Sequence, residues 1–294
     1  MGRSIRFPFL VDLKKVDSKA EVLTLNANAD IERRFESSGP LLNRLLVASV
    51  TGVMQVDGKA LPPVAPRADA ARARAQQALR ARLDPAAGPL WDDETLAALV
   101  AAVSGRASAA TIGPSAQQAV GRVFAPGYRG DAASFAAARD LDDAVHSRNL
   151  LRRLMLRLTG RLRRSRQLLA DRVNGNLAGV HGTSIAVHNM VHGFETMRAL
   201  FMRGERASAD EIVKQCLFAP PTVLRQATAR GQSVAGEMRK GTLVLFELET
   251  IRKTSPDAET VFMAGTWAEC PALLFVPALY RAVWDGALTA EKRT

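Results

Sequence analysis

Cys270 is the residue of this chain best placed for chemistry. It stands in the segment FMAGTWAECPALL, between a turn that contains a glycine and a helix expected to begin behind Pro271. Backbone N–H groups at a helix N-terminus stabilise a thiolate, which can act as a nucleophile or as a ligand for a soft metal ion or haem iron. The alternative is a small buried cysteine that packs as an apolar side chain.

Three of the four histidines recur at helical spacing. His181, His188 and His192 stand at i, i+7 and i+11, which in a regular α-helix places them within roughly 40° of one another. His188 and His192 have the i, i+4 spacing that chelates a metal, and Glu195 follows one turn later. The pattern therefore offers two interpretations, a helical metal site and an ordinary polar helix face.

An arginine-rich block runs from Arg148 to Arg172 and holds nine arginines and one acid, Asp171. Its leucines and Met155 recur as a helical stripe, which is expected to pack inward and leave the arginines outside. Such a face could bind a phosphate backbone, an acidic partner protein or an anionic membrane, or it could simply be solvated. Because the block has no aromatic side chain to stack on bases, nucleic acid is not the expected partner.

The charge of the chain is concentrated in that block. The 294 residues include 40 Lys plus Arg and 29 Asp plus Glu, a net charge of +11, of which the block supplies +8 (nine minus one). The remainder, at +3, is close to neutral, which favours a local docking face. No uncharged run of membrane-spanning length occurs, and two cysteines are too few for a disulfide framework, so a cytoplasmic protein with free thiols is expected.

The hydrophobic patterning predicts a mainly α (α+β) fold with a small sheet built from both chain ends. Strands are expected over 7–13, 47–56, 231–238 and 241–249. The proline-rich stretch 59–67 suggests a boundary between an N-terminal strand and helix segment, 1–66, and a helical body, 67–294, within one cooperative domain. Helices are expected over 20–35, 68–82, 93–104, 115–124, 132–144, 147–159, 160–173, 177–203, 208–217, 220–229 and 272–284.

Four segments in the last 120 residues, read together, resemble the cytochrome P-450 family of haem-thiolate monooxygenases. Residues 178–184, AGVHGTS, resemble the family's A-G-x-[D/E]-T-T segment, and residues 209–221 resemble its helix ending in L-x-x-P-P. Residues 222–246, with Arg225 and KGT, follow the next motif, and FMAG…CP resembles the cysteine loop. The four segments stand in the family's order, and the resemblance is confined mainly to residues 175–285.

The resemblance implies a haem cofactor and a set of residues around it. Cys270 would be the thiolate ligand of the haem iron, and Arg225 would pair with a haem propionate. Phe262 and Gly265 would belong to the cysteine loop. The implied activity is oxidation, or peroxide chemistry, on an apolar small molecule or lipid. An acidic redox partner would dock on the Arg148–Arg172 block.

On the other side of the haem, the resemblance assigns the oxygen-binding face to a helix carrying Gly179, His181 and Thr183. His181 takes the place of the family's acid, so an imidazole would deliver protons, which suits peroxide chemistry. It could also ligate the iron.

The chain departs from the family at several positions. The family's E-x-x-R pair would fall at Lys214 and Leu217, and Ala268 and Ala272 replace a basic residue and a glycine beside the cysteine. Two other hypotheses remain at this stage. One is a metal-binding protein that uses the histidine face, and the other is a relative without haem or catalysis that binds an acidic partner.

Overall fold

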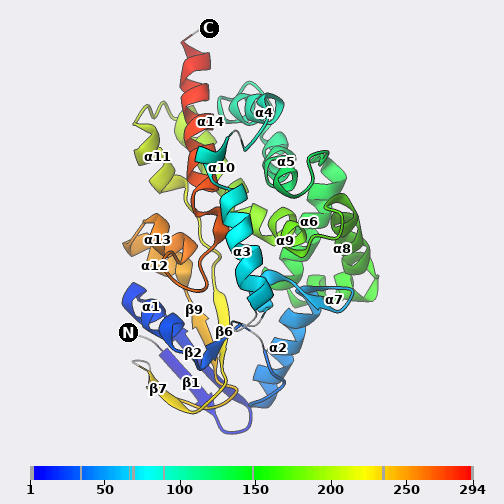
Figure 1. The fold of residues 1–294 in the computed structure, drawn as a ribbon, viewed down its shortest axis with the longest axis vertical. Coiled ribbons are helices and arrows are strands. Elements are labelled where there is room, and N and C mark those ends of the chain that lie inside the picture. Colours follow the sequence, from blue (N-terminus) through cyan, green and yellow to red (C-terminus); the bar gives the residue numbers. More distant parts are fainter. Residues whose placement is uncertain are drawn as a thin grey trace. The chain divides into compact units, whose positions relative to one another are not determined.

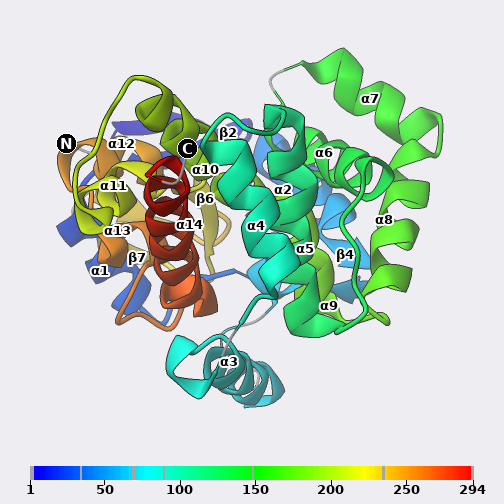
Figure 2. The same cartoon turned by 90° about the horizontal axis from the view of Figure 1, so that it is seen from above.

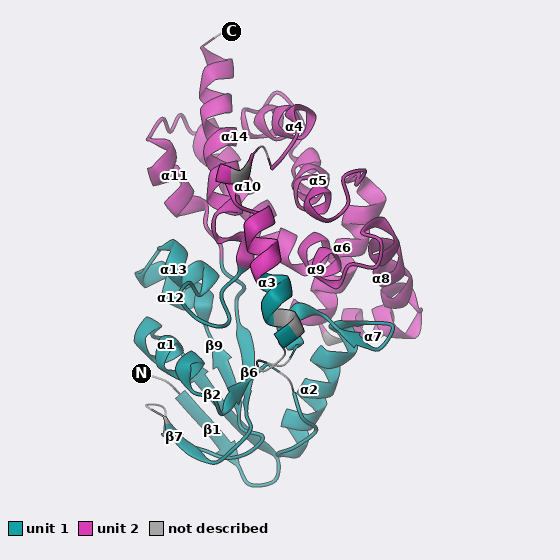
Figure 3. Cartoon of the chain, in the orientation of Figure 1, with its two compact units in different colours: residues 1–76, 219–270 teal, residues 77–218, 271–294 magenta. Residues whose placement is uncertain are grey.

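The computed structural model describes residues 3–33, 35–65, 67, 70–88, 90–147, 149–233 and 236–292. The chain divides into two compact units (Figure 3): unit 1 comprises residues 1–76 and 219–270, and unit 2 comprises residues 77–218 and 271–294. This division differs from the boundary expected at residue 66, because strands from the C-terminal part of the chain pair with N-terminal ones. Unfolding as one cooperative domain stays a prediction.

Unit 1 is built on a five-stranded sheet. The bounds of the strands, in their order across the sheet, are β1 Arg3–Phe7, β2 Val11–Val16, β9 Leu243–Phe246, β6 Val223–Ala227 and β3 Ile31–Glu32. β2 pairs in parallel with β9, and β9 pairs antiparallel with β6 (Figure 1). The expected small sheet made from both chain ends is therefore confirmed.

Several predictions of secondary structure in unit 1 are wrong in part or in full. The strand predicted over 7–13 spans the turn between β1 and β2, and the helix predicted over 20–35 ends at Ala27, before β3. Most of the range 47–56, predicted as a strand, belongs to helix α2, Leu41–Val53. Its valines face the protein at helical spacing, and this packing overrides their strand propensity. The range 220–229, predicted as a helix, contains β6, because pairing with β9 and β3 holds it extended.

The remaining elements of unit 1 are short. Helices α12 and α13, which precede the cysteine loop, were not expected from the sequence. The bounds are α1 Lys19–Ala27, β4 Gln55–Val56, β5 Lys59–Ala60, a 3-10 turn Pro62–Val64, β7 Gly231–Ser233, β8 Gly236–Met238, α12 Leu248–Thr254 and α13 Ala258–Phe262.

Unit 2 is helical throughout its described residues, as predicted. Figure 2 shows α4 beside α5, and α7 at the rim of the unit next to α6 and α8. No helix among the described residues is long and apolar enough to cross a bilayer. The bounds are α3 Ala70–Arg82 (shared with unit 1), α4 Asp93–Val103, α5 Ile112–Phe124, α6 Ala132–His146, α7 Leu150–Leu158, α8 Arg161–Arg172, α9 Leu177–His181, α10 Val187–Met202, α11 Ala209–Cys216 and α14 Phe275–Glu291.

The core of unit 2 lies where α10 crosses α14. The Phe194 and Tyr280 rings meet edge to face with centroids 4.8 Å apart, and the Tyr280 hydroxyl donates to the Met190 carbonyl at 3.1 Å. Gly193 makes this crossing possible, because a Cβ there would lie 2.0 Å from the Tyr280 hydroxyl. The two helices are thereby fixed against each other by a backbone position that only glycine can occupy.

The helix predicted over 177–203 is interrupted. A π-helical segment, Gly182–Ala186, separates α9 from α10. In a π turn each N–H bonds five residues back, so one extra residue enters the turn and side chains beyond it rotate by about 100°. Such segments occur frequently at functional sites.

Candidate functional site

The cysteine loop of unit 1 is closed by its own backbone. The Cys270 N–H donates to the Phe262 carbonyl at 2.8 Å, joining the last residue of α13 to the cysteine. Gly265, at φ +72°, donates its N–H to the Glu269 carboxylate at 2.7 Å. Phe262 is buried and Cys270 half-buried. The Phe262 backbone is therefore tied to Cys270 in this loop, while the role of the Phe262 side chain toward a cofactor stays a prediction.

The element that follows Cys270 differs from the one expected. Pro271 begins a single 3-10 turn, Pro271–Leu273, and α14 begins only at Phe275. The thiol therefore precedes a short turn, and Cys270 does not lie at the N-terminus of an α-helix as the sequence predicted. The loop itself fixes its position.

Three arginines gather around Trp267 in this loop. The guanidinium carbons of Arg33, Arg67 and Arg225 lie 4.9, 5.3 and 5.9 Å from the Trp267 ring centroid. Arg33 also donates to the Ala268 carbonyl at 2.7 Å. Because cations favour aromatic faces but repel one another, such a cluster is suited to a ligand that carries negative charge. Of the three, only Arg225 was predicted from the sequence, because Arg33 and Arg67 precede Trp267 by about 200 residues along the chain.

Arg225 is the most buried of the three arginines. Its side chain leaves β6 and the residue is 3% exposed. The guanidinium donates to the Leu224 carbonyl at 2.8 Å, approaches the Met263 sulfur at 3.9 Å and lies 5.6 Å from the Phe246 ring centroid. A cation held this deeply is stabilised strongly by any anion that reaches it.

The interrupted helix of unit 2 carries the other predicted residues. His181 ends α9 and is half-buried, while Thr183 lies in the π segment and is fully buried. The Thr183 hydroxyl donates to the Gly179 carbonyl at 2.8 Å, and a Cβ on Gly179 would lie 3.0 Å from Phe124. Contacts within unit 2 therefore explain the position of the Thr183 side chain and the need for a small residue at Gly179. The roles of both residues toward a cofactor stay predictions.

The Thr183 segment lies against a buried polar cluster. The Gln117 amide donates to the Thr183 and Ser134 carbonyls at 2.8 and 3.1 Å, and the Ser134 hydroxyl donates to Gln117 at 2.6 Å. Burial raises the pKa of the neighbouring Tyr128 to about 12, so its phenol stays neutral. These bonds hold the π segment against α5 and α6.

The chain matches solved structures in fold, although comparisons of its sequence find no match. No family model and no curated protein matches it. CYP154C4 from Streptomyces sp. W2061 aligns with 98% of this chain and 84% of its own, at a TM-score of 0.54 and 14% identity. P450BioI, solved with a hexadec-9Z-enoic acid ligated acyl carrier protein, aligns with 98% of this chain and 87% of its own, at 0.57 and 15%. Cytochrome P450EX alpha, solved with myristic acid, aligns over 94% and 80%, at 0.56 and 12%. The chain has the cytochrome P450 fold.

This P450 fold departs from the family's sequence pattern where the resemblance expects E-x-x-R. Lys214 on α11 is exposed and Leu217 is buried. The same spacing occurs instead on α12, where Arg252 donates to both oxygens of Glu249 at 2.7 and 2.8 Å. This pair, E-T-I-R at 249–252, was not predicted from the sequence, because it follows the strands of the sheet whereas the resemblance places E-x-x-R before them.

The predicted histidine face is not formed in this P450 fold. The π segment between His181 and His188 rotates His181 away by roughly 100°. The His188 ring packs against Phe135, with centroids 5.4 Å apart, whereas the exposed His192 pairs with Glu195 at 3.3 Å. In the described part of the chain, no three His, Cys, Asp or Glu side chains converge as a metal site. The structure therefore lends no support to the helical metal-binding hypothesis.

The arginine block is less charged in space than along the chain, because three of its arginines are neutralised by acids outside it. Arg148 lies outside the described residues. Arg163 and Arg164 on α8 are exposed. The neutralised ones are Arg152 with Asp143, Arg161 with Asp140 at 2.7 Å and Arg172 with Asp131 at 2.7 Å.

The apolar stripe of the block does not pack inward as expected. In α7 only Leu156 is buried among the residues whose exposure is described. Because α7 sits at the rim of unit 2 and packs mainly against α6 and α8, one apolar face of this helix remains outside the core. The exposed side chains are Leu151, Leu154, Met155 and Leu158.

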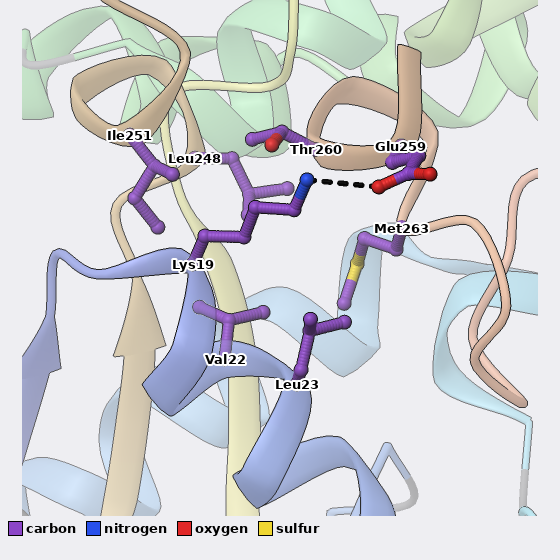
Figure 4. Close-up of a pocket in the computed structure, with 8 residues that line it drawn as sticks. All are labelled: Lys19, Val22, Leu23, Leu248, Ile251, Glu259, Thr260 and Met263. Atoms are coloured by element: carbon purple, nitrogen blue, oxygen red, sulfur yellow. Dashed lines mark hydrogen bonds and ion pairs between the residues drawn. The ribbon is translucent and has the colours of Figure 1, made fainter. Parts of the chain in front are cut away.

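A small cavity in unit 1 is too narrow for a substrate. It has a volume of about 10 Å³, room for a single water molecule. Lys19 crosses it and pairs with Glu259 at 2.9 Å (Figure 4). Its lining comes from α1, α12 and the end of α13: Lys19, Val22, Leu23, Leu248, Ile251, Glu259, Thr260 and Met263.

Proposed function

We propose that the chain is a haem-thiolate oxidoreductase, with Cys270 as the iron ligand. The observation that carries this proposal is the cysteine loop, which the Cys270–Phe262 hydrogen bond closes beside the arginines around Trp267. A haem held by a thiolate favours cleavage of an O–O bond and supplies the oxidising chemistry.

The residues of the cysteine loop fit such a group. The half-buried Cys270 thiol would hold the iron, while the buried Phe262 side chain would exclude water from the same loop. Arg225, joined by Arg33 and Arg67, would hold the haem carboxylates through charge-assisted hydrogen bonds, each worth about 1.5–3 kcal/mol. The three arginines supply the positive charge that Ala268, in place of the family's basic residue, does not.

His181 is the proposed proton carrier. It is half-buried at the end of α9 and precedes the π segment. An imidazole that both accepts and donates a proton suits reaction with peroxide, whose two oxygen atoms arrive already reduced. Peroxide dependence is therefore part of the proposal, and iron ligation by His181 is the alternative.

An apolar lipid is the proposed substrate class. This proposal draws on two P450 structures of the same fold, one described with myristic acid and one with a fatty-acyl carrier protein. The free thiols of Cys216 and Cys270 suit a reducing compartment, and we propose the cytoplasm.

An acidic redox partner would dock on the block formed by α7 and α8. Arg163 and Arg164 are exposed there, and the outward stripe on α7 offers an apolar surface. Interfaces commonly surround an apolar centre with charged residues at the rim, and an acidic partner would complement the arginines. The competing hypothesis is a protein without haem or catalysis that binds the same acidic partner.

The absorption spectrum of the reduced protein with carbon monoxide tests the proposed function. It reports haem and thiolate ligation together, so a spectrum without the thiolate signature would refute the role of Cys270. A protein that takes up no haem would favour the competing hypothesis.

A further inference from the structure

The turn between β1 and β2 and the start of α2 form an exposed apolar surface, named here the apolar tip. Phe9 at its centre is 93% exposed. The largest apolar patches on proteins that act alone are usually functional. The tip consists of Phe7, Phe9, Leu10, Leu41, Leu42 and Leu45, each at least 44% exposed.

The apolar tip is held together by backbone hydrogen bonds. The Leu41 N–H donates to the Phe9 carbonyl at 3.0 Å, and the Leu42 N–H donates to the Leu10 carbonyl at 2.9 Å. The first N–H groups of a helix lack partners within the helix, and here the hairpin turn supplies them. Asn43 adds a hydrogen bond from its amide to the Asp12 carbonyl at 2.7 Å. The exposed side chains are thus presented by a fixed scaffold.

The backbone conformation of Phe9 and the exposure of its ring both cost stability, and folding of the chain requires neither. Its φ is +61°, a left-handed conformation that glycine or asparagine adopts at lower cost than a bulky aromatic residue. Its ring also remains in water. A residue that costs stability in both ways is best explained by a contact outside the molecule.

The exposed charged side chains on the two segments that form the tip are both positive, and two acids from outside these segments, Asp12 and Glu237, pair with their third arginine, Arg6. Residues 1–11 and 37–56 contain Arg3, Arg6 and Arg44 and no Asp or Glu. Arg3 and Arg44 are exposed, whereas Arg6 pairs with Asp12 at 3.1 Å. Apolar side chains flanked by exposed arginines match an anionic lipid surface, which offers an apolar interior beneath negative headgroups.

We propose that the apolar tip inserts into an anionic membrane surface and binds the protein there peripherally. A second copy of the chain fits less well, because a symmetric contact through the tip would bring the arginines of both copies together. A projecting phenylalanine would also require a matching pocket in a protein partner, whereas lipid deforms around it. This inference does not depend on haem.

Vesicle flotation tests the proposal. The full chain is mixed with phosphatidylcholine vesicles, with or without phosphatidylglycerol, and Phe9→Ser/Leu10→Ser is compared with the wild type. We expect binding to the anionic vesicles and a loss of at least about tenfold in the variant, since two large apolar groups no longer leave water. The matched control is Met202→Ser/Leu274→Ser, also two exposed apolar groups of similar size but away from the tip, which should bind as the wild type does. The proposal is overturned if the wild type does not bind the anionic vesicles, or if the control variant loses as much binding as Phe9→Ser/Leu10→Ser.

A second variant keeps the apolar character and reports insertion directly. The emission of the new tryptophan in Phe9→Trp is the difference between the spectra of the variant and the wild type. This emission should shift to shorter wavelength with anionic vesicles and remain unchanged with neutral ones. Sedimentation equilibrium identifies the rival occupant. A wild-type dimer that Phe9→Ser/Leu10→Ser dissociates, without any vesicle-induced shift, would assign the tip to a second copy and contradict the proposal.

Discussion

The Cys270 N–H and the Phe262 carbonyl, 2.8 Å apart, join the end of α13 to the cysteine and make the intervening residues a closed loop. This bond fixes the Cys270 backbone beside the end of α13 without help from the helix that follows. The position of Cys270 therefore depends on the loop's own hydrogen bonds and on the arginines packed against Trp267, all within unit 1.

Replacing Arg225 should weaken haem binding. In Arg225→Met the buried guanidinium is removed while most of the apolar stem is kept, so a charge-assisted contact worth about 1.5–3 kcal/mol is lost and haem affinity falls roughly tenfold to a hundredfold. Titration of the apoprotein with haem measures this. Arg230→Met, at an 81% exposed side chain paired with Glu237, is the control and should bind haem normally. Equal affinity in the two variants would remove Arg225 from the haem site.

His181 should control proton transfer during turnover. We expect His181→Ala to lower the peroxide-driven rate of the haem-loaded protein by about a hundredfold, the usual contribution of a general acid–base group. His181→Asp, which restores a proton carrier, should recover part of that rate, and the exposed His192→Ala should not change it. An unchanged rate in His181→Ala would instead leave proton delivery to solvent.

The stability of unit 2 should fall below neutral pH because of His188. Burial lowers the pKa of His188, so the unfolded chain takes up this proton at higher pH than the native chain does. Protonation therefore favours unfolding below about pH 6.5, at a cost of about 1.4 kcal/mol for each unit by which the two pKa values differ. Denaturant titrations of the wild type and His188→Leu from about pH 7.5 to pH 5.5 measure it. The variant should lose less stability over this range; parallel curves would contradict the assignment.

The ionisation of Asp142 affects the stability of unit 2 in a lower pH range than the protonation of His188 does. Burial opposes its ionisation, but the hydrogen bond with His146, at 2.7 Å, and the nearby histidine charges lower its pKa overall. Its stabilising effect is thus complete above its ordinary pKa, near 3.9, and is lost only as pH falls through the lower native value. It therefore contributes nothing to the change between about pH 7.5 and 5.5.

Charge reversal on α8 should impair electron delivery and leave haem content intact. In Arg163→Glu/Arg164→Glu two exposed arginines become repulsive to an acidic redox partner, and we expect the association rate with such a partner to fall by at least about tenfold at low salt. Stopped-flow reduction measures the rate, and peroxide-driven turnover, which needs no partner, should be unaffected. Arg203→Glu, exposed after α10, is a charge-reversal control away from the block. Equal slowing in this control would point to a general charge effect.

Much of the helical body could be predicted from sequence, because its signals are local. Asp92 caps α4, with its side chain accepting from the Thr95 N–H at 2.8 Å, and an aspartate at this position is a local sequence signal for a helix start. The helix boundaries of unit 2 follow from apolar periodicity together with such caps. The sheet was harder, since β6 and α2 are decided by distant pairing and packing and not by the propensity of their own residues.

The site was predictable only where a motif is contiguous. Cys270 and Phe262 stand eight residues apart, and their association was expected. Arg33 and Arg67 reach Trp267 from the far end of the chain, and no local pattern marks them. The histidine face failed for a different reason, because helical spacing assumes 3.6 residues per turn and the π segment breaks that rule.

The central claim, that Cys270 binds haem iron as a thiolate, is tested most directly by the carbon-monoxide difference spectrum of the reduced, haem-supplemented protein. The matched control is Cys216→Ala, because burial raises the pKa of Cys216 to about 12 and keeps it a thiol inside unit 2. We predict the long-wavelength Soret band of a thiolate-ligated haem in the wild type and in Cys216→Ala, and its loss in Cys270→Ala. A Cys270→Ala protein that keeps this band, or a wild type that binds no haem, would contradict the account.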